Sequence, residues 1–365
     1  MRILYTCQDI SVTGGLERII SEKASAMAIR GNDVWLLVCN PPESSPAYSL
    51  DSRVHLVDLA LPQPHGFIQK LLFKIRQNIK IRKAIHKIRP DITIAAPTWL
   101  TLSIIFKPRH LVLESHSSRS NMFSKEHHSL YKRLKVYIAE RKADCVVTLT
   151  KGETINWPHA RRIETIPNFI TLDPKPINTI RSNRYMAIGR IASEKGFDML
   201  IDAWAIVTKH YPEAIIDIFG EGEQRNVLEE KVIDLSLQNN VFFKGLCTDL
   251  KAVYESHAAL VVSSHYEGFG LVIAEAMICG TPVIALDCLY GPHELINHNS
   301  SGILVPYYNM TREERVRGLA DAICRLMDNS EERFRLGETG KTAAIQYLPK
   351  FIIPQWENLF HSISY

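Results

Sequence analysis

Residues 259–277 read ALVVSSHYEGFGLVIAEAM, and the order of residue types in this stretch indicates the fold. Residues 259–263 form an apolar run with the length of a buried strand. A loop that carries Glu267 follows, then Gly268-Phe269-Gly270, and then an apolar helix over residues 271–279. A strand that leads through a glycine-rich turn into a helix is the repeating unit of a parallel α/β sheet.

Two carboxylates in this stretch, Glu267 and Glu275, point to sugar chemistry, because carboxylates accept hydrogen bonds from vicinal sugar hydroxyls. Glu275 lies just over one helical turn into the helix and can project towards its start. The backbone amides there can bind a phosphate; they belong to Gly268, Phe269, Gly270 and Leu271. Alternatively, Glu267 caps the helix and Glu275 pairs with a lysine, but the motif is long and specific, which favours the binding role.

Strand and helix patterns alternate along almost the whole chain. We expect strands at residues 2–6, 34–39, 92–96, 111–114, 145–149, 185–188, 215–219, 241–244, 259–263 and 283–286. Helices are expected at residues 16–30, 198–209, 224–235, 248–256, 271–279 and 312–327. This alternation predicts parallel sheets built from strand–helix–strand units.

The alternation is interrupted once, where prolines cluster with Asn and Asp. The sequence therefore predicts an α/β protein with two doubly wound, Rossmann-like domains, residues 1–170 and 185–345, joined by a linker at 171–184. Residues 346–365 are expected to form a helical segment that packs back on the first domain. Ligands of open α/β sheets bind at the carboxyl ends of strands, so we expect a cleft between two facing sheets.

Two further loops follow predicted strands. Gly14 and Gly15 lie between the first strand and the first helix, where glycine lets the backbone approach an anion, although such a turn is more often just a tight connection between strand and helix. Residues 189–196 read GRIASEKG and follow the first strand of the second domain. Arg190 and Lys195 in this loop suit a diphosphate, Arg as a fork and Lys as a point charge; the alternative is a solvated charged loop.

Composition excludes some classes of protein. The N-terminus has no basic stretch before a long apolar run, and no window is long and apolar enough to span a membrane. Seven cysteines at irregular spacing indicate reduced thiols and a cytoplasmic location. The net charge is only +4, and we expect no nucleic-acid partner.

Positive charge is concentrated in the first domain, where residues 61–142 hold 17 Lys and Arg against four Asp and Glu. Residues 67–80 predict a helix with an apolar face and a basic face; the apolar face comprises Phe67, Ile68, Leu71, Leu72, Ile75 and Ile79. We expect this face to pack on its own domain; binding to an anionic membrane surface is the alternative. The regional charge excess favours a phosphate-bearing or membrane-bound partner.

Together these motifs resemble those of glycosyltransferase family 4, which are retaining enzymes of the GT-B fold, with two facing Rossmann-like domains. The resemblance rests on residues 189–196, Gly220-Glu221-Gly222 and residues 267–275, together with Gly14-Gly15, His116 and Ile166-Pro167-Asn168. It implies that Arg190 and Lys195 hold the donor diphosphate, that Glu275 binds the ribose hydroxyls, that Glu267 contacts the donor sugar, and that His116 touches the sugar or its leaving oxygen.

The resemblance is to the transferases of bacterial surface polysaccharides and lipopolysaccharides. It implies a nucleotide-sugar donor and a saccharide acceptor, lipid-linked or a lipopolysaccharide core, at the inner face of the plasma membrane. Residues 288–295, CLYGPHEL, are similar to segments of enzymes that use UDP-sugars.

Arg190 and Lys195 can stabilise the negative charge that develops on the leaving diphosphate. No Asp-x-Asp follows a strand, and we expect no metal and no other cofactor. A nucleotide-sugar epimerase of the same fold and a non-catalytic partner subunit are the alternatives. The glutamate motif argues against the first, and the retained Arg190, Lys195 and glutamates argue against the second.

Overall fold

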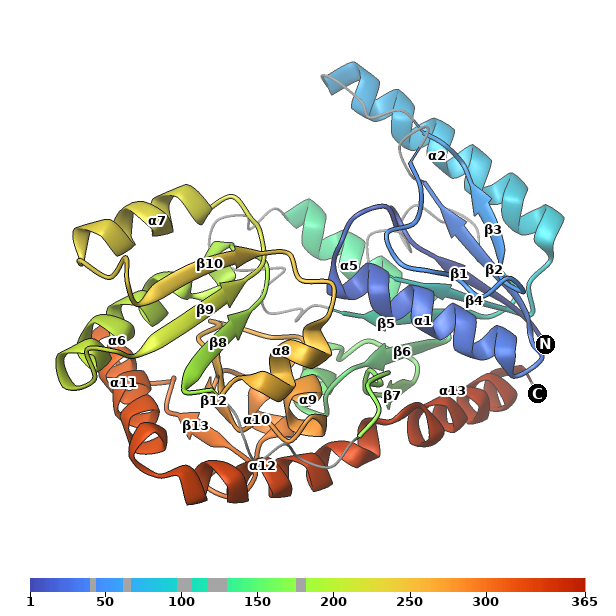
Figure 1. Ribbon diagram of the computed structural model, residues 1–365. Coiled ribbons are helices and arrows are strands. Elements are labelled where there is room, and N and C mark those ends of the chain that lie inside the picture. Colours follow the sequence, from blue (N-terminus) through green and yellow to red (C-terminus); the bar gives the residue numbers. More distant parts are fainter. Residues whose placement is uncertain (40–43, 62–66, 97–106, 117–129, 175–181, 365) are drawn as a thin grey trace. The chain divides into compact units, whose positions relative to one another are not determined.

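The structure is a computed structural model that describes residues 1–39, 44–61, 67–96, 107–116, 130–174 and 182–364; for residues 67–71 and 130–132 it describes the backbone alone. The chain forms two compact units (Figure 1). The first comprises Met1–Asn168 together with Lys350–Tyr365, and the second comprises Phe169–Pro349. Part of the expected linker, residues 175–181, lies outside the described residues.

In the first unit the described residues form a seven-stranded parallel sheet in the order β3-β2-β1-β4-β5-β6-β7. The strands are β1 (Arg2–Thr6), β2 (Asp33–Val38), β3 (His55–Asp58), β4 (Ile92–Ala95), β5 (Leu111–Ser115), β6 (Cys145–Thr148) and β7 (Ile163–Thr165). The helices are α1 (Gly15–Ile29), α2 (Phe67–Ile88), α5 (Leu130–Lys142) and α13 (Pro349–Ser364), with a 3₁₀ turn η1 (Gly152–Asn156).

The second unit holds a six-stranded parallel sheet in the order β10-β9-β8-β11-β12-β13. Its strands are β8 (Arg184–Ile188), β9 (Ile215–Phe219), β10 (Val241–Gly245), β11 (Leu260–Val262), β12 (Val283–Leu286) and β13 (Ile303–Val305). Its helices are α6 (Phe197–His210), α7 (Arg225–Asp234), α8 (Leu250–Ser256), α9 (Leu271–Ile278), α10 (Gly291–Leu295), α11 (Arg312–Asp328) and α12 (Ser330–Ala344), with 3₁₀ turns η2 (Ser193–Lys195) and η3 (Ile345–Tyr347).

The predicted fold class is confirmed: each unit is a doubly wound α/β sheet. In both, the chain fills one half of the sheet and then crosses to the other, between β1 and β4 in the first unit and between β8 and β11 in the second. Beyond the carboxyl ends of the strands at such a crossing point, the loops diverge and leave room for a ligand. The loops after β8 and β11 carry Lys195 and Glu267, so this topology places both at the crossing point.

Every predicted strand is present to within one or two residues, but β3, β7 and β13 were not predicted. All three are short and lie at the ends of their sheets. In β3, His55, Leu56 and Asp58 are exposed and only Val57 is partly buried. A strand at a sheet edge with so little burial lacks the apolar run by which a buried strand is recognised.

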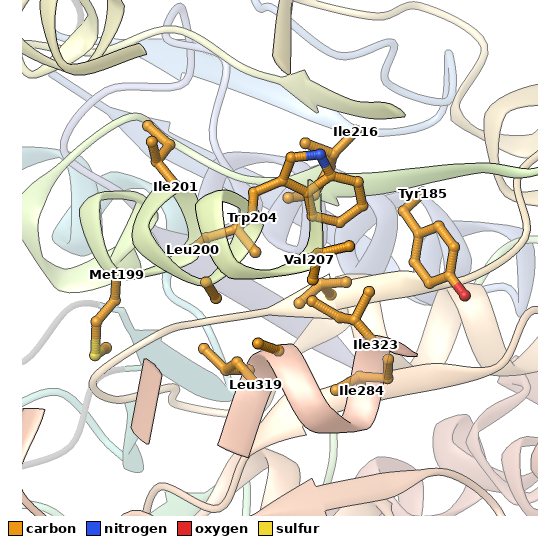
Figure 2. Close-up of a cluster of buried hydrophobic side chains, with 14 of the residues drawn as sticks. Tyr185, Met199, Leu200, Ile201, Trp204, Val207, Ile216, Ile284, Leu319 and Ile323 are labelled. Carbon is orange, nitrogen blue, oxygen red and sulfur yellow. The ribbon is translucent and has the colours of Figure 1, made fainter. Parts of the chain in front are cut away.

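The main core of the second unit lies between its sheet and the helices α6 and α11. Trp204 of α6 is fully buried, and its indole N–H donates to the carbonyl of Ala214. The ring of Trp204 is tilted against that of Tyr185 on β8, at 5.8 Å between centroids (Figure 2). Leu319 and Ile323 of α11 complete this packing, which makes the sheet a firm base for the loops at its carboxyl edge.

Helix α13 belongs to the first unit (Figure 1), where its side chains contact α1 and Arg162, the residue before β7. Trp356 is fully buried and lies under the ammonium of Lys23, 4.6 Å from its ring centroid. At the end of α1, the guanidinium of Arg30 donates two hydrogen bonds to Glu357, at 2.6 and 2.8 Å.

The expectation that the apolar face of α2 packs on its own domain is wrong for three of its residues. Leu72, Ile75 and Ile79 are 48%, 49% and 50% exposed; the side chains of Phe67, Ile68 and Leu71 lie outside the described ones. The residues of α2 that do pack against the sheet are Ile81, Ile85 and Ile88, in the second half of the helix.

Candidate active site

The loop after β8 packs directly against the loop after β11, and two hydrogen bonds join them. Gly196 has a left-handed backbone, with φ +61°, and a β-carbon there would collide with the carbonyl oxygen of Ser263 at 2.3 Å. The Ser263 hydroxyl donates to the carbonyl of Lys195 at 2.9 Å. The amide of His265 donates to the carbonyl of Glu194 at 2.9 Å. A glycine is required at position 196 because the two loops approach each other this closely.

The contact between the two loops brings Lys195 next to Glu267, although 72 residues separate the two in the chain. The Lys195 ammonium donates to Glu267 Oε1 at 2.7 Å, and the hydroxyl of Ser264 donates to the same oxygen at 2.7 Å. The side chain of Lys195 is 22% exposed and that of Glu267 is 10% exposed. A cation and an anion therefore lie side by side at the crossing point of the sheet, where an incoming polar ligand can exchange partners with either.

Arg190 lies in the same loop but points into solvent. Its side chain is 70% exposed, and its guanidinium pairs with Glu194 four residues later. Glu194 is 17% exposed, but the guanidinium itself is mostly in water, and an ion pair with one solvated partner contributes little to stability. Arg190 can therefore leave Glu194 for an anionic ligand at small cost.

Glu275 is more deeply buried than its place near the start of α9 predicts. It is 1% exposed, and its Oε2 accepts a hydrogen bond from the hydroxyl of Tyr254 on α8 at 2.9 Å. Helix α9 begins after Gly270, whose φ is +87°, and Phe269 at this helix start is 4% exposed. The main chain thus turns sharply into α9, with Glu275 fixed by its hydrogen bond to α8.

In the first unit, Gly14 and Gly15 occupy the predicted position between β1 and α1. Gly14 is the residue before the helix, and its backbone is extended. A β-carbon at Gly14 would collide with the carboxylate of Glu17, so a negative charge of the chain itself already lies beside this helix start.

His116 follows β5 and lies in a buried charged group. Its Nε2 is 3.2 Å from Glu114 Oε1, and its side chain is 9% exposed. The ammonium of Lys23, from α1, donates a hydrogen bond to the same carboxylate oxygen. Both Lys23 and Glu114 are fully buried.

Burial by itself raises the pKa of Glu114, but the charges of Lys23 and His116 lower that pKa to about 2. Burial also lowers the pKa of Lys23, and the Glu114 carboxylate opposes that effect. The carboxyl of Glu114 is therefore ionised at neutral pH, next to the imidazole of His116.

Lys23 and Glu114 were not predicted as functional residues, although the sequence carries a signal for both. Lys23 falls on the buried stripe of α1, among Ile19, Ala24 and Met27. Glu114 ends an otherwise apolar strand. A charged residue inside an apolar periodicity is rarely buried unless it has a partner. Within the part of the chain that the structure describes, no three His, Cys, Asp or Glu side chains gather as metal ligands would.

The two halves of the chain match two different sequence profiles of known protein families. Residues 13–174 match the sequence profile described as Glycosyltransferase Family 4, and residues 174–343 match the profile described as Glycosyl transferases group 1. Together the two profiles cover every described strand of the two sheets except β1, which precedes residue 13. The chain belongs to glycosyltransferase family 4.

This glycosyltransferase is 27% identical over 367 residues to an uncharacterized glycosyltransferase of Haemophilus influenzae, with 98% of this chain and 99% of that protein covered. It is 31% identical to the poly(ribitol-phosphate) alpha-N-acetylglucosaminyltransferase of Staphylococcus aureus over 64% of this chain. That alignment covers 47% of the relative, so the chain matches about half of its length.

Among solved structures, the glycosyltransferase is similar to a point mutant of S. aureus TarM, crystallised with Fondaparinux, alpha-GlcNAc-glycerol and UDP. The TM-score is 0.81 at 18% identity, with 98% of this chain and 99% of that chain covered. At this identity the likeness bears on the fold, and it agrees with the two Rossmann-like sheets expected for a GT-B enzyme.

Proposed function

We propose that this glycosyltransferase moves a hexosyl group from a UDP-sugar to a saccharide acceptor, with retention of the anomeric configuration, in the synthesis of a cell-surface polysaccharide or lipopolysaccharide. The observation that carries the proposal is the Lys195–Glu267 pair at the crossing point of the second sheet, 2.7 Å apart. The relative from S. aureus is named as a poly(ribitol-phosphate) alpha-N-acetylglucosaminyltransferase, which supports transfer of a hexosyl group to a polymer. The TarM structure contains UDP, which supports a UDP-sugar donor.

Lys195 and Glu267 suit the two halves of such a donor. Breaking the bond between the anomeric carbon and the phosphate oxygen leaves negative charge on the nucleotide diphosphate. Lys195 and Arg190 stabilise that charge more strongly in the transition state than in the ground state. When the ammonium of Lys195 turns to the diphosphate, Glu267 Oε1 is released to accept a hydrogen bond from a sugar hydroxyl.

The remaining roles follow the family motif residue by residue. Glu275 binds the ribose hydroxyls, and the amides of residues 268–271 contact phosphate. The Gly14–Gly15 turn and His116 belong to the first unit, and His116 contacts the transferred sugar. We propose no resident metal ion or cofactor for these steps, because the cations of Lys195 and Arg190 supply the charge that leaving-group departure requires.

Release of free nucleotide tests this function. The purified protein is incubated with UDP-, GDP-, ADP- and CMP-sugars, each with and without a bacterial lipid extract as acceptor. We expect release of UDP from a UDP-hexose, accelerated by the extract, and NMR of the product should show the anomeric configuration of the donor. Conversion of the donor into its epimer without acceptor would instead identify an epimerase.

A membrane-associated acceptor is favoured by the surface of α2. Its sequence contains seven Lys and Arg and no Asp or Glu. Three apolar side chains, Leu72, Ile75 and Ile79, are half exposed on it beside the exposed Lys74 and Arg76. Exposed apolar residues interspersed with cations suit the headgroup region of an anionic bilayer.

We therefore propose reversible binding of the first unit to the anionic inner face of the plasma membrane, where a lipid-linked saccharide is available. None of the described helices is both long and apolar enough to cross a membrane. Attachment in this proposal depends on the surface of α2.

A further inference from the structure

Helix α5 of the first unit exposes a group of apolar side chains that the proposed reaction does not use. Leu134, Tyr137 and Ile138 are each about half exposed. They are spaced three and four residues apart, so they lie next to one another on the helix surface. Val136 and Ala139, on another side of α5, pack against the sheet. The exposed group is therefore an apolar stripe that points away from the sheet.

The exposed charged side chains that the structure describes on α5 are positive. The helix contains five Lys and Arg and one acidic residue, Glu140. Glu140 is buried and accepts a hydrogen bond from the amide of His159. Arg133 and Arg141 are exposed beside the apolar stripe. Apolar side chains interspersed with cations suit the headgroup region of an anionic bilayer.

Helices α5 and α2 cover the same face of the first sheet. Leu111 and Leu113 are two residues apart on β5, so their side chains point to one face. Leu111 packs in the cluster that includes Ile85 of α2. Leu113 packs in the cluster that includes Val136 of α5. The connections β3–α2–β4 and β5–α5–β6 also run in the same direction along the sheet, and right-handed connections of this kind place their helices on one face.

The exposed apolar side chains of α2 point away from this face as well. Gln77 and Ile81 are buried on the side of α2 that packs on the sheet. At 3.6 residues per turn, Leu72, Ile75 and Ile79 lie on roughly the opposite side of the helix. Both helices thus present apolar and cationic surface in one direction, where a single flat bilayer can contact them together.

We propose that α2 and α5 form one membrane-binding surface, so that the sheet face they cover lies against an anionic bilayer. The proposal rests on the proposed attachment through α2 and adds a second contact and an orientation. Two weak contacts on one rigid unit bind more tightly than either alone, because the second forms within the same complex.

This orientation decides where the loops of the first unit lie. The strands run along the membrane, and the sheet lies about one helix diameter, roughly 10 Å, above the headgroups. Gly14 and His116 follow strands of this sheet. The orientation therefore offers their loops to a saccharide that projects from the bilayer on a lipid carrier.

Co-sedimentation with vesicles of phosphatidylglycerol and phosphatidylcholine tests the second contact. The test variant is Leu134→Ser with Ile138→Ser, and the matched control is Val227→Ser with Ile233→Ser, which removes two exposed apolar side chains from α7 in the second unit. Loss of the apolar area that the bilayer covers should lower the partition coefficient of the test variant roughly 10-fold. The control should bind as the wild type does. All four positions are exposed, so thermal unfolding should change little in either variant.

A charge reversal tests the electrostatic part. Arg141→Glu should lower the partition coefficient roughly 5-fold or more at low salt, and the difference from wild type should shrink as salt rises. The control Arg317→Glu reverses an exposed charge on α11 of the second unit and should have no such effect.

Fluorescence quenching by brominated lipid tests the orientation. Ile75→Trp and Leu134→Trp place an added indole on the outer sides of α2 and α5, and Val227→Trp places one on the second unit. After subtraction of the wild-type signal, we expect quenching of the first two indoles and none of the third. Quenching of Ile75→Trp without quenching of Leu134→Trp would refute the orientation.

Other outcomes separate the proposals. If the α5 variants bind as wild type does, while Lys74→Glu with Arg76→Glu abolishes binding, α5 makes no membrane contact and α2 alone attaches the protein. If the wild type binds no vesicle, both membrane contacts are wrong, whereas release of UDP from a UDP-sugar still decides the proposed transfer. A dimer in sedimentation velocity that Leu134→Ser with Ile138→Ser dissociates, with lipid binding unchanged, would assign this face to a second copy of the chain and overturn the proposal.

Discussion

Replacing Lys195 by Ala is the most direct test of the charge arrangement at the crossing point of the second sheet. In the structure its ammonium lies 2.7 Å from Glu267 Oε1. In the proposed reaction the same ammonium faces the diphosphate. The substitution removes one positive charge from each state, and the two losses are measured separately.

The loss in catalysis is expected to be large. Two unit charges about 4 Å apart interact by about 4 kcal/mol at an effective dielectric constant near 20, before desolvation is subtracted. Removal of one preorganised group that stabilises transition-state charge costs about 3–4 kcal/mol. We therefore expect kcat/KM of Lys195→Ala to fall roughly 10²–10³-fold.

The loss in stability is expected to be small, because Glu267 keeps its hydrogen bond from Ser264 at 2.7 Å. A partly exposed ion pair contributes about 1 kcal/mol or less to the free energy of unfolding. The matched control is Lys231→Ala. Lys231 forms an ion pair with Asp202 at 2.7 Å in the same unit, with side-chain exposures of 26% and 23%. It should lose similar stability and no turnover.

Calorimetry separates the diphosphate contact from a general disturbance of the site. Lys195→Ala should bind UDP more weakly than the wild type does and should bind uridine, which has no phosphate, equally well. Lys195→Arg should retain part of the UDP affinity. If folded Lys195→Ala matches the Lys231→Ala control in both kcat/KM and UDP affinity, Lys195 does not contact the diphosphate.

Four further predictions concern other residues. Glu275→Ala should weaken binding of both UDP and uridine, because both contain the ribose; unchanged calorimetric affinities would remove Glu275 from the site. Transfer activity should survive EDTA, since Lys195 supplies cationic charge; complete loss that Mn²⁺ restores would contradict this mechanism. Co-sedimentation with anionic vesicles should decrease as salt rises and should weaken when Lys70, Lys74, Arg76 and Lys80 become Glu; equal absence of binding to anionic and neutral vesicles at low salt would refute the membrane proposal. Burial raises the pKa of Asp217, but His257 and Arg184 lower it from 3.8 to about 2, so its stabilising effect is complete above pH 3.8 and disappears as the pH falls towards 2. Unfolding curves of Asp217→Asn and wild type should therefore differ at pH 7 and converge near pH 2.

Features that depend on neighbouring residues could be predicted from the sequence, whereas features that depend on exposure or on contacts between distant residues could not. Buried strands such as β8 and β11 were predictable because their residues are almost all apolar, and helices such as α6 and α11 because their apolar residues recur at a helical period. The helices α5, α10 and α12 were not predicted. The loops with Lys195 and Glu267 were predicted as ligand sites because each directly follows such a strand, and the structure brings these two residues together. The edge strand β3 was not predictable, since its side chains are mostly exposed.

The sequence by itself determined the two doubly wound domains and the family, because these depend on local periodicity and on motifs of a few adjacent positions, and the same motifs supplied most of the candidate site residues. Only the tertiary structure decided which of these residues meet. Lys195 reaches Glu267 because Gly196 lets two loops touch, Glu275 is covered by α8, and Lys23 finds Glu114 across 91 residues. Such pairings arise from sheet order and packing, and no local pattern in the chain encodes them.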